Sequence, residues 1–393
     1  MLQNFQSFLN NDYAIGSLLL LATLGAILLP NGPWSDSYQV FLQHNLTLRL
    51  GPLEITENIQ DWINSTLMAV FFLNVGLEIK QELVLGSLSS ARKAALPVAG
   101  AIGGMIVPAL VFTMFNWRQL TIIGWAIPMA TDPAFAIAIL SVLRNRIPAG
   151  LRAFLVTLAV VDDIGATLVI ALVYHEGFSL LPILISAAIV LLLLLLNKAS
   201  VRSLFPYLIL GIFLWVAFME SGIHTSVAGV ILALTIPVRS RHADQAGPVT
   251  RLERVLTPWV NYGILPVFAL SNAGITFQGI SLSAIFLTPV VVGIFLGLLV
   301  GKPMGIVAAC LAVASLNLAH LPDGVRWRHL LGAGFLGGIG FTTSIFLANL
   351  AFTGDVLFDH SKIGILPASV SAAIIGWLVL RMIAGTEGEN QLA

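Results

Sequence analysis

The chain is dominated by long apolar segments, about twelve in number, each near the ~20 residues that cross a lipid bilayer as a helix. They cover residues 13–30, 62–79, 95–115, 121–143, 153–174, 180–197, 204–219, 223–238, 257–274, 289–312, 329–350 and 362–383. Charged residues make up 10 % of the chain and apolar residues 58 %, against roughly 25 % and 45–50 % in soluble domains. So few charges cannot cover a soluble surface, which excludes a cytoplasmic enzyme. We therefore expect an all-α polytopic membrane protein with about twelve transmembrane helices.

The basic residues predict the orientation of the chain in the membrane. If the N-terminus is cytoplasmic and the loops alternate, fifteen Lys and Arg residues lie inside and three outside. The outer three are Arg49, Arg118 and Lys362, and the inner fifteen are Lys80, Arg92, Lys93, Arg144, Arg146, Arg152, Lys198, Arg202, Arg239, Arg241, Arg251, Arg254, Arg326, Arg328 and Arg381. Cytoplasmic loops carry the excess of basic residues, so both termini are expected in the cytoplasm. The nineteen basic and nineteen acidic side chains cancel, which leaves no net charge to attract nucleic acid.

Residues 44–58, in the first outer loop, have the pattern of a periplasmic β-hairpin. Leucines alternate with polar residues over 46–50, Gly51-Pro52 is a turn signal, and the alternation resumes over 53–55. The hairpin is either a plain surface loop or an edge strand that pairs with a second copy of the chain to form a homodimer. No loop is long enough for a separate soluble domain, so residues 1–393 are expected to form a single membrane domain.

Four charged residues lie at the centres of predicted transmembrane segments. Asp132 is the midpoint of 121–143, and Asp162 and Asp163 occupy the middle of 153–174. Lys302 lies beside the midpoint of 289–312. Each such charge costs roughly 2.5–3.5 kcal/mol, or on the order of ten kcal/mol in total. A buried structural ion pair accounts for the lysine and one aspartate but not for the other two, so we expect a polar functional site at the midplane.

Two of the apolar segments contain residues that interrupt a helix. Asp132 precedes Pro133, which lacks an N–H and disfavours helical geometry in the residue before it. In 329–350, five glycines within 332–340 weaken the helix. An interrupted segment in each half of the chain indicates a transporter with inverted-topology repeats, here approximately 95–174 and 289–383.

Several sequence motifs, in their order along the chain, resemble those of the NhaA-type sodium/proton antiporters. They are LMAVFFLNVGLEIK (67–80), TDPAFA (131–136), VVDDIGA (160–166), LPVFALSNAGI (265–275) and GKPMGI (301–306). The resemblance implies twelve helices in a bacterial inner membrane, the fourth and eleventh being discontinuous and crossing near the midplane. It also implies a secondary transporter, not an enzyme, that exchanges cytoplasmic Na+ or Li+ for external H+. Such exchange would be electrogenic, would serve pH and sodium homeostasis, and would need no cofactor.

The resemblance assigns a role to each charged residue at the midplane. Asp163 matches the carboxylate central to cation and proton binding. Asp162 matches its neighbour, which joins that site or pairs with the membrane lysine, and Lys302 matches this lysine. Asp132 matches the acid at the helix break and Thr131 the adjacent polar group. Asp162, Asp163 and Thr131 are therefore the expected ligands of the transported Na+.

The same resemblance places Glu78, Glu82 and Glu253 at the acidic mouth of a cytoplasmic funnel, where they would act in the response to pH. Arg254 and Thr257 stand where well-known members of the family carry histidines. Histidine is the side chain that titrates near neutrality, so these two positions leave the activation pH open.

Two other functions are compatible with carboxylates inside a membrane. A passive cation channel would use rings of oxygen ligands from several subunits and would need no lysine beside them. An intramembrane aspartyl protease would place two acids on separate helices, one of them in a G-x-G-D setting. Here the two closest acids are adjacent, and no G-x-G-D occurs in the sequence.

Overall fold

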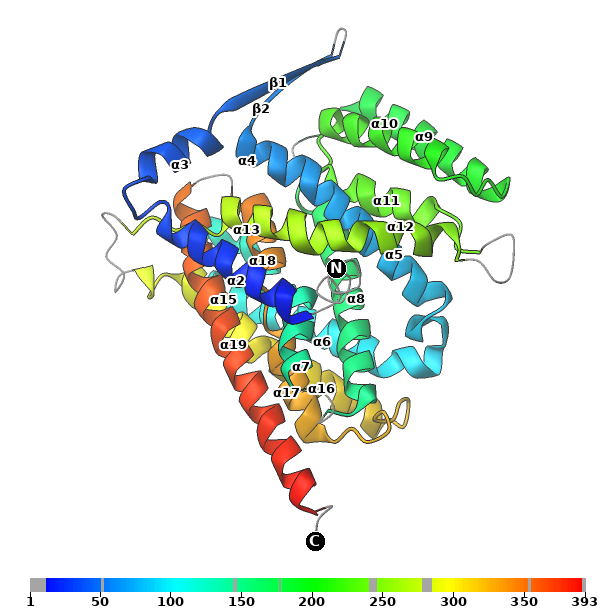
Figure 1. Cartoon of the computed structure of the whole chain (residues 1–393). Coiled ribbons are helices and arrows are strands. Elements are labelled where there is room, and N and C mark those ends of the chain that lie inside the picture. The colour runs from blue at the N-terminus through cyan, green and yellow to red at the C-terminus, as the bar shows by residue number, and fades with distance from the viewer. Residues whose placement is uncertain are drawn as a thin grey trace, which may run out of the picture. The chain divides into compact units, whose positions relative to one another are not determined.

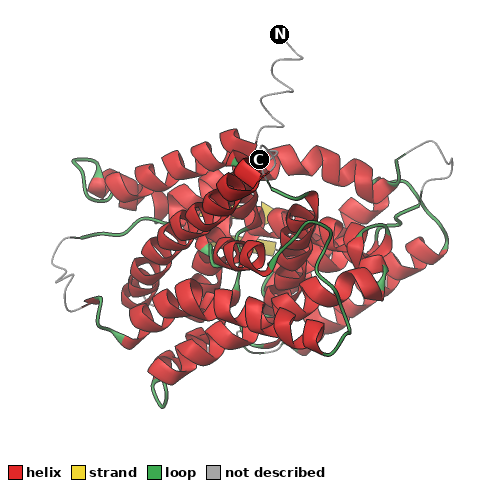
Figure 2. Cartoon of the chain, turned by 90° about the horizontal axis from the view of Figure 1, so that it is seen from below, coloured by secondary structure: helices red, strands yellow, loops and turns green. Residues whose placement is uncertain are grey.

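The computed structural model describes residues 12–50, 53–143, 147–175, 177, 179–239, 246–277, 285–352 and 355–390. Most of these residues lie in helices, with one short two-stranded sheet (Figure 1, Figure 2). Within these ranges, seven helices are long and apolar enough to cross a membrane, and a bent helix pair makes an eighth candidate. Three shorter apolar helices accompany them: Tyr13–Leu28, Phe205–Ser221 and Ser226–Thr235. The predicted class, an all-α polytopic membrane protein, is confirmed.

Every predicted apolar segment falls on a helix or on consecutive helices. In chain order these are α2 (Asp12–Leu28), α4–η1–α5 (Ile59–Trp62, Ile63–Leu67, Met68–Val84), α6 (Ala91–Phe115), η3–α7 (Leu120–Met129, Pro133–Val142), α8 (Ala149–Leu172), α9 (Leu180–Lys198), α10 (Phe205–Ser221), α11 (Ser226–Thr235), α12–η5–α13 (Pro248–Trp259, Val260–Ile264, Leu265–Asn272), α15–η6–α16 (Pro289–Leu296, Gly297–Gly301, Lys302–Ser315), α17–α18 (Trp327–Gly337, Phe341–Ala351) and α19 (Asp355–Asn390). Helix α3 (Ser35–Leu42) and the short η2 (Ser87–Ser89) lie in connections. The ninth segment begins at Pro248, earlier than its apolar run, because proline is well suited to the first turn of a helix.

The chain folds into two compact units, each assembled from separate stretches of sequence. Unit 1 comprises Met1–Ser17, Leu85–Ala166 and Gly279–Ala393, and unit 2 comprises Leu18–Val84 and Thr167–Gln278. The four charged residues predicted at the midplane all belong to unit 1, whereas the three predicted funnel glutamates belong to unit 2.

In unit 1, helices α6 and α16 pack with their backbones in close approach. A Cβ added at Gly103 would overlap the carbonyl oxygen of Gly305, and a Cβ added at Gly305 would overlap that of Gly103. Small residues at such contacts let membrane helices approach closely, so that van der Waals packing holds them together. Helix α19 packs against α15 and α17 and extends this framework.

In unit 2, α5 is held against α11 by close packing and by a charged side chain. Gly229 of α11 lies against the backbone of Ala69 and Leu73 in α5. The Lys80 ammonium of α5 donates to the carbonyl oxygens of Leu234 and Ile236, at the C-terminal end of α11. A cation is stabilising there because the helix dipole places partial negative charge at that end.

The segment predicted as a hairpin contains strands β1 (Asn45–Leu50) and β2 (Leu53–Asn58), which pair in antiparallel fashion. Leu48 is paired with Ile55, and Arg49 forms an exposed ion pair of 2.7 Å with Glu54. The turn signal Gly51-Pro52 lies outside the described residues. The side chains of Leu46 and Leu48 are exposed, whereas that of Ile55, the partner of Leu48, is buried.

Candidate ion-binding site

The first helix break lies between η3 and α7, at Ala130–Asp132. Segment η3 is a 3-10 helix that ends at Met129, and Ala130 and Asp132 have extended backbone geometry. Pro133 then opens α7 at its first turn, and Asp132 is the N-cap of α7, its Oδ1 accepting a hydrogen bond from Phe135 N at 3.2 Å. The break predicted from Asp132-Pro133 is therefore present, and the residue before the proline has the geometry that this proline favours.

The second break lies between α17 and α18, at residues 338–340. The two helices form a bent pair with an angle of 46°. The glycines of this segment allow close approach, since a Cβ at Gly338 would lie 2.5 Å from the carbonyl oxygen of Leu298. The break occurs where the sequence has its highest density of glycine.

Hydrogen bonds join the two breaks to each other. The Asp132 amide donates to the carbonyl oxygen of Ile339 at 2.6 Å, and the Thr131 hydroxyl lies 2.8 Å from the carbonyl oxygen of Gly337. Asp132 Oδ2 accepts from both the amide and the hydroxyl of Thr342, at 3.1 and 2.5 Å. Asp132 thus places one carboxylate against the N-termini of both α7 and α18, where helix dipoles favour negative charge.

Lys302 follows the π-helical segment η6 directly and is fully buried. Its ammonium donates to the carbonyl oxygen of Met129, the last residue of η3, and lies 2.8 Å from Asp162 Oδ2. Asp132 and Lys302 therefore place opposite charges on the helix ends that meet at the breaks. π-Helical turns occur frequently at functional sites, but the sequence prediction did not anticipate this one.

Asp162 and Asp163 lie side by side on α8, and both are buried. Asp162 Oδ2 is shared between the Lys302 ammonium and the Thr131 hydroxyl, which lies 2.5 Å away. Asp162 Oδ1 is also buried, and no hydrogen bond reaches it from the part of the chain that the structure describes. Successive residues on a helix point ~100° apart, so Asp163 presents its carboxylate in a different direction.

The structure brings Thr131, Asp162 and Lys302 together through direct contacts within unit 1, and Asp132, next to Thr131 in the chain, is bound to Thr342. Thr342 is a further member that the sequence prediction missed. Its signal was the run of hydroxyl residues Thr342-Thr343-Ser344, shortly after the glycines. Carboxylate, hydroxyl and freed carbonyl oxygens are the ligands that hard cations prefer, so this arrangement is chemically suited to a small alkali cation.

The buried pair leads to a prediction about stability. We expect Lys302→Met to lower the free energy of unfolding by about 3–5 kcal/mol, because Asp162 then remains as an uncompensated buried charge. The double variant Lys302→Met/Asp162→Leu should recover most of that loss, since Thr131 still has Gly337 as an acceptor. Thermal denaturation of the purified proteins in detergent measures the difference. If the double variant is as unstable as the single variant, the uncompensated charge of Asp162 is not the cause of the lost stability.

The three funnel glutamates come together separately, within unit 2. Glu78 and Glu82 lie one turn apart on α5, and Glu253 lies on α12, which packs against α5. The charges of Glu253 and Glu82 both act on Glu78, and all three side chains are partly buried. Burial raises the pKa of Glu253, which precedes the apolar run, and the adjacent Arg254 lowers it.

Comparison with known proteins identifies the group to which these features belong. The family model described as Na+/H+ antiporter 1 matches residues 6–380. The chain belongs to this family. The Na(+)/H(+) antiporter NhaA of Shewanella amazonensis is 46 % identical over 388 residues, 98 % of each chain. That of Shewanella pealeana is 44 % identical over 386 residues, 98 % of each chain. That of an Escherichia coli O1:K1 strain is 46 % identical over 387 residues, 97 % of this chain and 98 % of the relative.

Membership of the Na+/H+ antiporter 1 family bears on the alternative functions. The relatives named above are transporters rather than enzymes, which does not favour an intramembrane protease. They are named as antiporters, which does not favour a passive channel either.

Proposed function

We propose that this chain exchanges cytoplasmic Na+ or Li+ for external H+, and that Asp163 binds either ion in turn. The observation that carries the proposal is a pair of adjacent, buried carboxylates on α8 beside one buried lysine. Asp162 is engaged by Lys302 and Thr131, and the neighbouring buried Asp163 supplies a second carboxylate on the same helix. An ion pair with Lys302 needs only one of these two carboxylates.

Competition for one carboxylate couples the two fluxes. A carboxylate that titrates near neutral pH holds a proton or a sodium ion, but not both. Facing the cytoplasm, the site exchanges its protons for Na+, and facing outward it exchanges Na+ for protons. Asp162 Oδ1 and the Thr131 hydroxyl supply further oxygens for the cation.

Asp132 and Lys302 act in this proposal as fixed charges that stabilise the helix breaks. Their contacts are to the N-terminal amides of α7 and α18 and to the last carbonyl of η3. A backbone that is broken inside a membrane persists only when its polar groups are satisfied by protein or face a wet cavity. If more protons than sodium ions are carried per cycle, the exchange is electrogenic, worth about 2.3 kcal/mol per charge per 100 mV.

The acidic group of unit 2, Glu78, Glu82 and Glu253, is proposed to line a cytoplasmic funnel and to act in the response to pH. Three neighbouring carboxylates attract cations to this end of α5 and α12. No cofactor takes part in the proposed cycle, and Na+, Li+ and H+ are its transported substrates.

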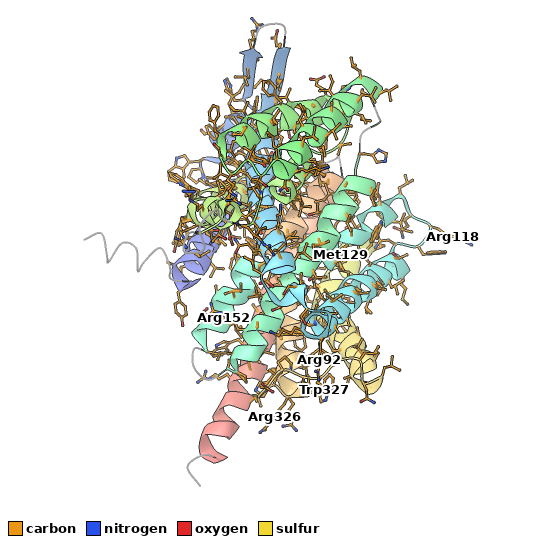
Figure 3. The ribbon with its side chains drawn as sticks, turned by 90° about the vertical axis from the view of Figure 1, so that its right-hand side faces the viewer. Arg92, Arg118, Met129, Arg152, Arg326 and Trp327 are labelled. Carbon is orange, nitrogen blue, oxygen red and sulfur yellow. The ribbon has the colours of Figure 1, made fainter. Side chains whose placement is uncertain are left out.

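We propose that both termini are cytoplasmic. Arg92 lies in the first turn of α6 and Arg118 just beyond its end, so the basic residue predicted inside and the one predicted outside lie at opposite ends of one helix. Figure 3 shows Arg92, Arg152 and Arg326 below Met129 in unit 1, whereas Arg118 lies level with Met129. The three basic residues predicted inside thus lie on one side of Met129, as expected for the positive-inside orientation. Arg144, Arg146 and Arg241, also predicted inside, lie outside the described residues.

We propose further that the hairpin β1–β2 joins two copies of the chain in a homodimer on the periplasmic side. In the described part of the chain the sheet contains only these two strands, so each strand has one edge without a strand partner. Such an edge is a template for pairing with another chain.

Replacing residues 46–57 by a short glycine linker should convert the purified dimer to a monomer, because it removes both strands. Light scattering in detergent after size-exclusion chromatography measures the mass. The matched control is Arg49→Ala/Glu54→Ala, which removes an exposed ion pair and leaves the backbone ladder intact. A dimer that survives loss of the hairpin would exclude this interface.

Inverted membrane vesicles with an acid interior and a pH-sensitive dye test the exchange itself. We expect Na+ or Li+, added outside, to make the interior more alkaline, and vesicles without the protein to show no such change. Choline chloride at the same concentration controls for ionic strength. If Na+ produces no proton movement at any pH from about 6.5, the ordinary histidine pKa, to about 9, the proposed function is wrong.

A further inference from the structure

A side-chain hydrogen bond joins α5 to α12 within unit 2. The Thr257 hydroxyl of α12 lies 3.1 Å from Asn74 Oδ1 of α5, and 2.9 Å from the carbonyl oxygen of Glu253 one turn earlier on its own helix. Asn74 is buried, with 8 % of its surface exposed, and Thr257 is partly buried. An amide and a hydroxyl are an unusual choice for a helix contact inside an apolar segment, where aliphatic residues would pack without polar groups to satisfy.

The position of this bond relates it to the acidic group. Asn74, Glu78 and Glu82 are spaced by four residues and share one face of α5, and Glu253 and Thr257 share one face of α12 in the same way. One turn from the bond along each helix therefore lie Glu78 and Glu253. Their charges interact, as expected if the bond sets the register in which the two helices face each other.

The opposite side of α5 is fixed independently of this bond. Gly76 lies against Ala233 and Val230 of α11, and Lys80 is bound to the terminal carbonyls of α11. Helix α5 is therefore firmly packed against α11. The hydrogen bond between Asn74 and Thr257 attaches it to α12. A change in this bond moves Glu253 relative to Glu78 without releasing α5.

We infer that Asn74 and Thr257 are positioning residues for the carboxylates of Glu78, Glu82 and Glu253, and that their hydrogen bond sets the pH at which transport becomes active. The inference rests on the proposed function and gives that function its regulation in this chain. A hydroxyl does not titrate, so here the pH response falls to the carboxylates that the bond holds together.

The direction of the effect follows from the groups around Glu253. Helix α5 presents Glu78, Glu82 and Lys80, of which Lys80 is engaged by α11 carbonyls. Helix α12 adds Arg251 and Arg254, η5 adds Tyr262, and α11 has no ionisable side chain. Burial against this surface raises the pKa of Glu253. Loosening α12 hydrates Glu253, returns its pKa toward the ordinary value, and so moves the deprotonation step to lower pH.

The test uses the full-length protein in inverted vesicles, with the half-activation pH of Na+-driven alkalinisation as the readout. Thr257→Val removes the hydroxyl at nearly constant shape, and Asn74→Leu removes the amide from the other side. Each should lower the half-activation pH by about 0.5–1 unit, the shift that matches the loss of one hydrogen bond. Thr257→Ser keeps the hydroxyl and should restore the wild-type profile.

A double-mutant cycle separates the bond from a general loss of packing. If the bond is the cause, Asn74→Leu/Thr257→Val should shift the profile no further than either single change. Additive shifts, or an unchanged profile in whichever single variant folds, would overturn the inference. In both cases wild type still couples Na+ to protons, so failure here is distinct from failure of the proposed function, in which wild type moves no protons.

Discussion

Asp163→Asn lowers the exchange of Na+ for H+ to the level of membranes without the protein. Asparagine has nearly the same shape as aspartate, but it neither binds a proton at physiological pH nor offers a charged oxygen to a cation. Both halves of the proposed cycle are therefore lost together. Vesicle alkalinisation after addition of Na+ measures the loss, and we expect none of it to return at higher Na+ concentration.

Two controls accompany the Asp163→Asn variant. Asp163→Glu keeps a titratable carboxylate at the same backbone position and should retain coupled exchange with weakened Na+ binding. Unchanged thermal stability of Asp163→Asn in detergent shows that the loss is not one of folding. If Asp163→Asn shows coupled exchange at the wild-type rate, Asp163 does not bind the transported ions.

Asp132→Ala is the second prediction with a large expected effect, and it concerns the structure rather than the transport step. The Asp132 carboxylate accepts hydrogen bonds from the Phe135 amide and from the amide and hydroxyl of Thr342. Each buried donor left without an acceptor costs roughly 1–3 kcal/mol, so the three together cost about 3–9 kcal/mol. Because a folded protein is stable by only about 5–15 kcal/mol in total, the variant should unfold at much lower temperature or fail to accumulate.

The size of this effect can be checked with graded substitutions. Asp132→Asn keeps one acceptor oxygen but removes the charge that faces the helix N-termini, so its thermal stability should lie between those of wild type and Asp132→Ala. Asp36→Ala, on the exposed first turn of α3, is the matched control and should change little. If Asp132→Ala melts at the wild-type temperature, the two breaks do not depend on this carboxylate.

Features with a large energetic cost in the membrane were predictable from the sequence. The length of each apolar segment follows from the bilayer thickness, and the central charges stand out because their burial is so costly. The break at Asp132 was also predictable, since Pro133 lacks an N–H and disfavours helical geometry in the residue before it. A run of glycines predicted the second break in the same way.

Features that depend on how the helices rotate against each other were not predictable. The sequence left open whether Asp162 joins the cation site or pairs with Lys302, because packing decides how α8 is rotated. In the structure Asp162 forms an ion pair with Lys302. Likewise, the contact of Thr342 with Asp132 and the bond of Asn74 with Thr257 join residues far apart in the chain, and a single sequence carries no signal for such pairs.

The proposed exchange is tested most directly in proteoliposomes that contain only this protein. Radioactive Na+ uptake and internal pH are recorded together while a pH gradient is imposed, for wild type and Asp163→Asn. We expect wild type to take up Na+ against its concentration gradient as protons leave, with uptake that saturates, and we expect Asp163→Asn to move neither ion. Sodium flux that proceeds without opposite proton movement, or that persists in Asp163→Asn, would contradict coupled exchange at this carboxylate.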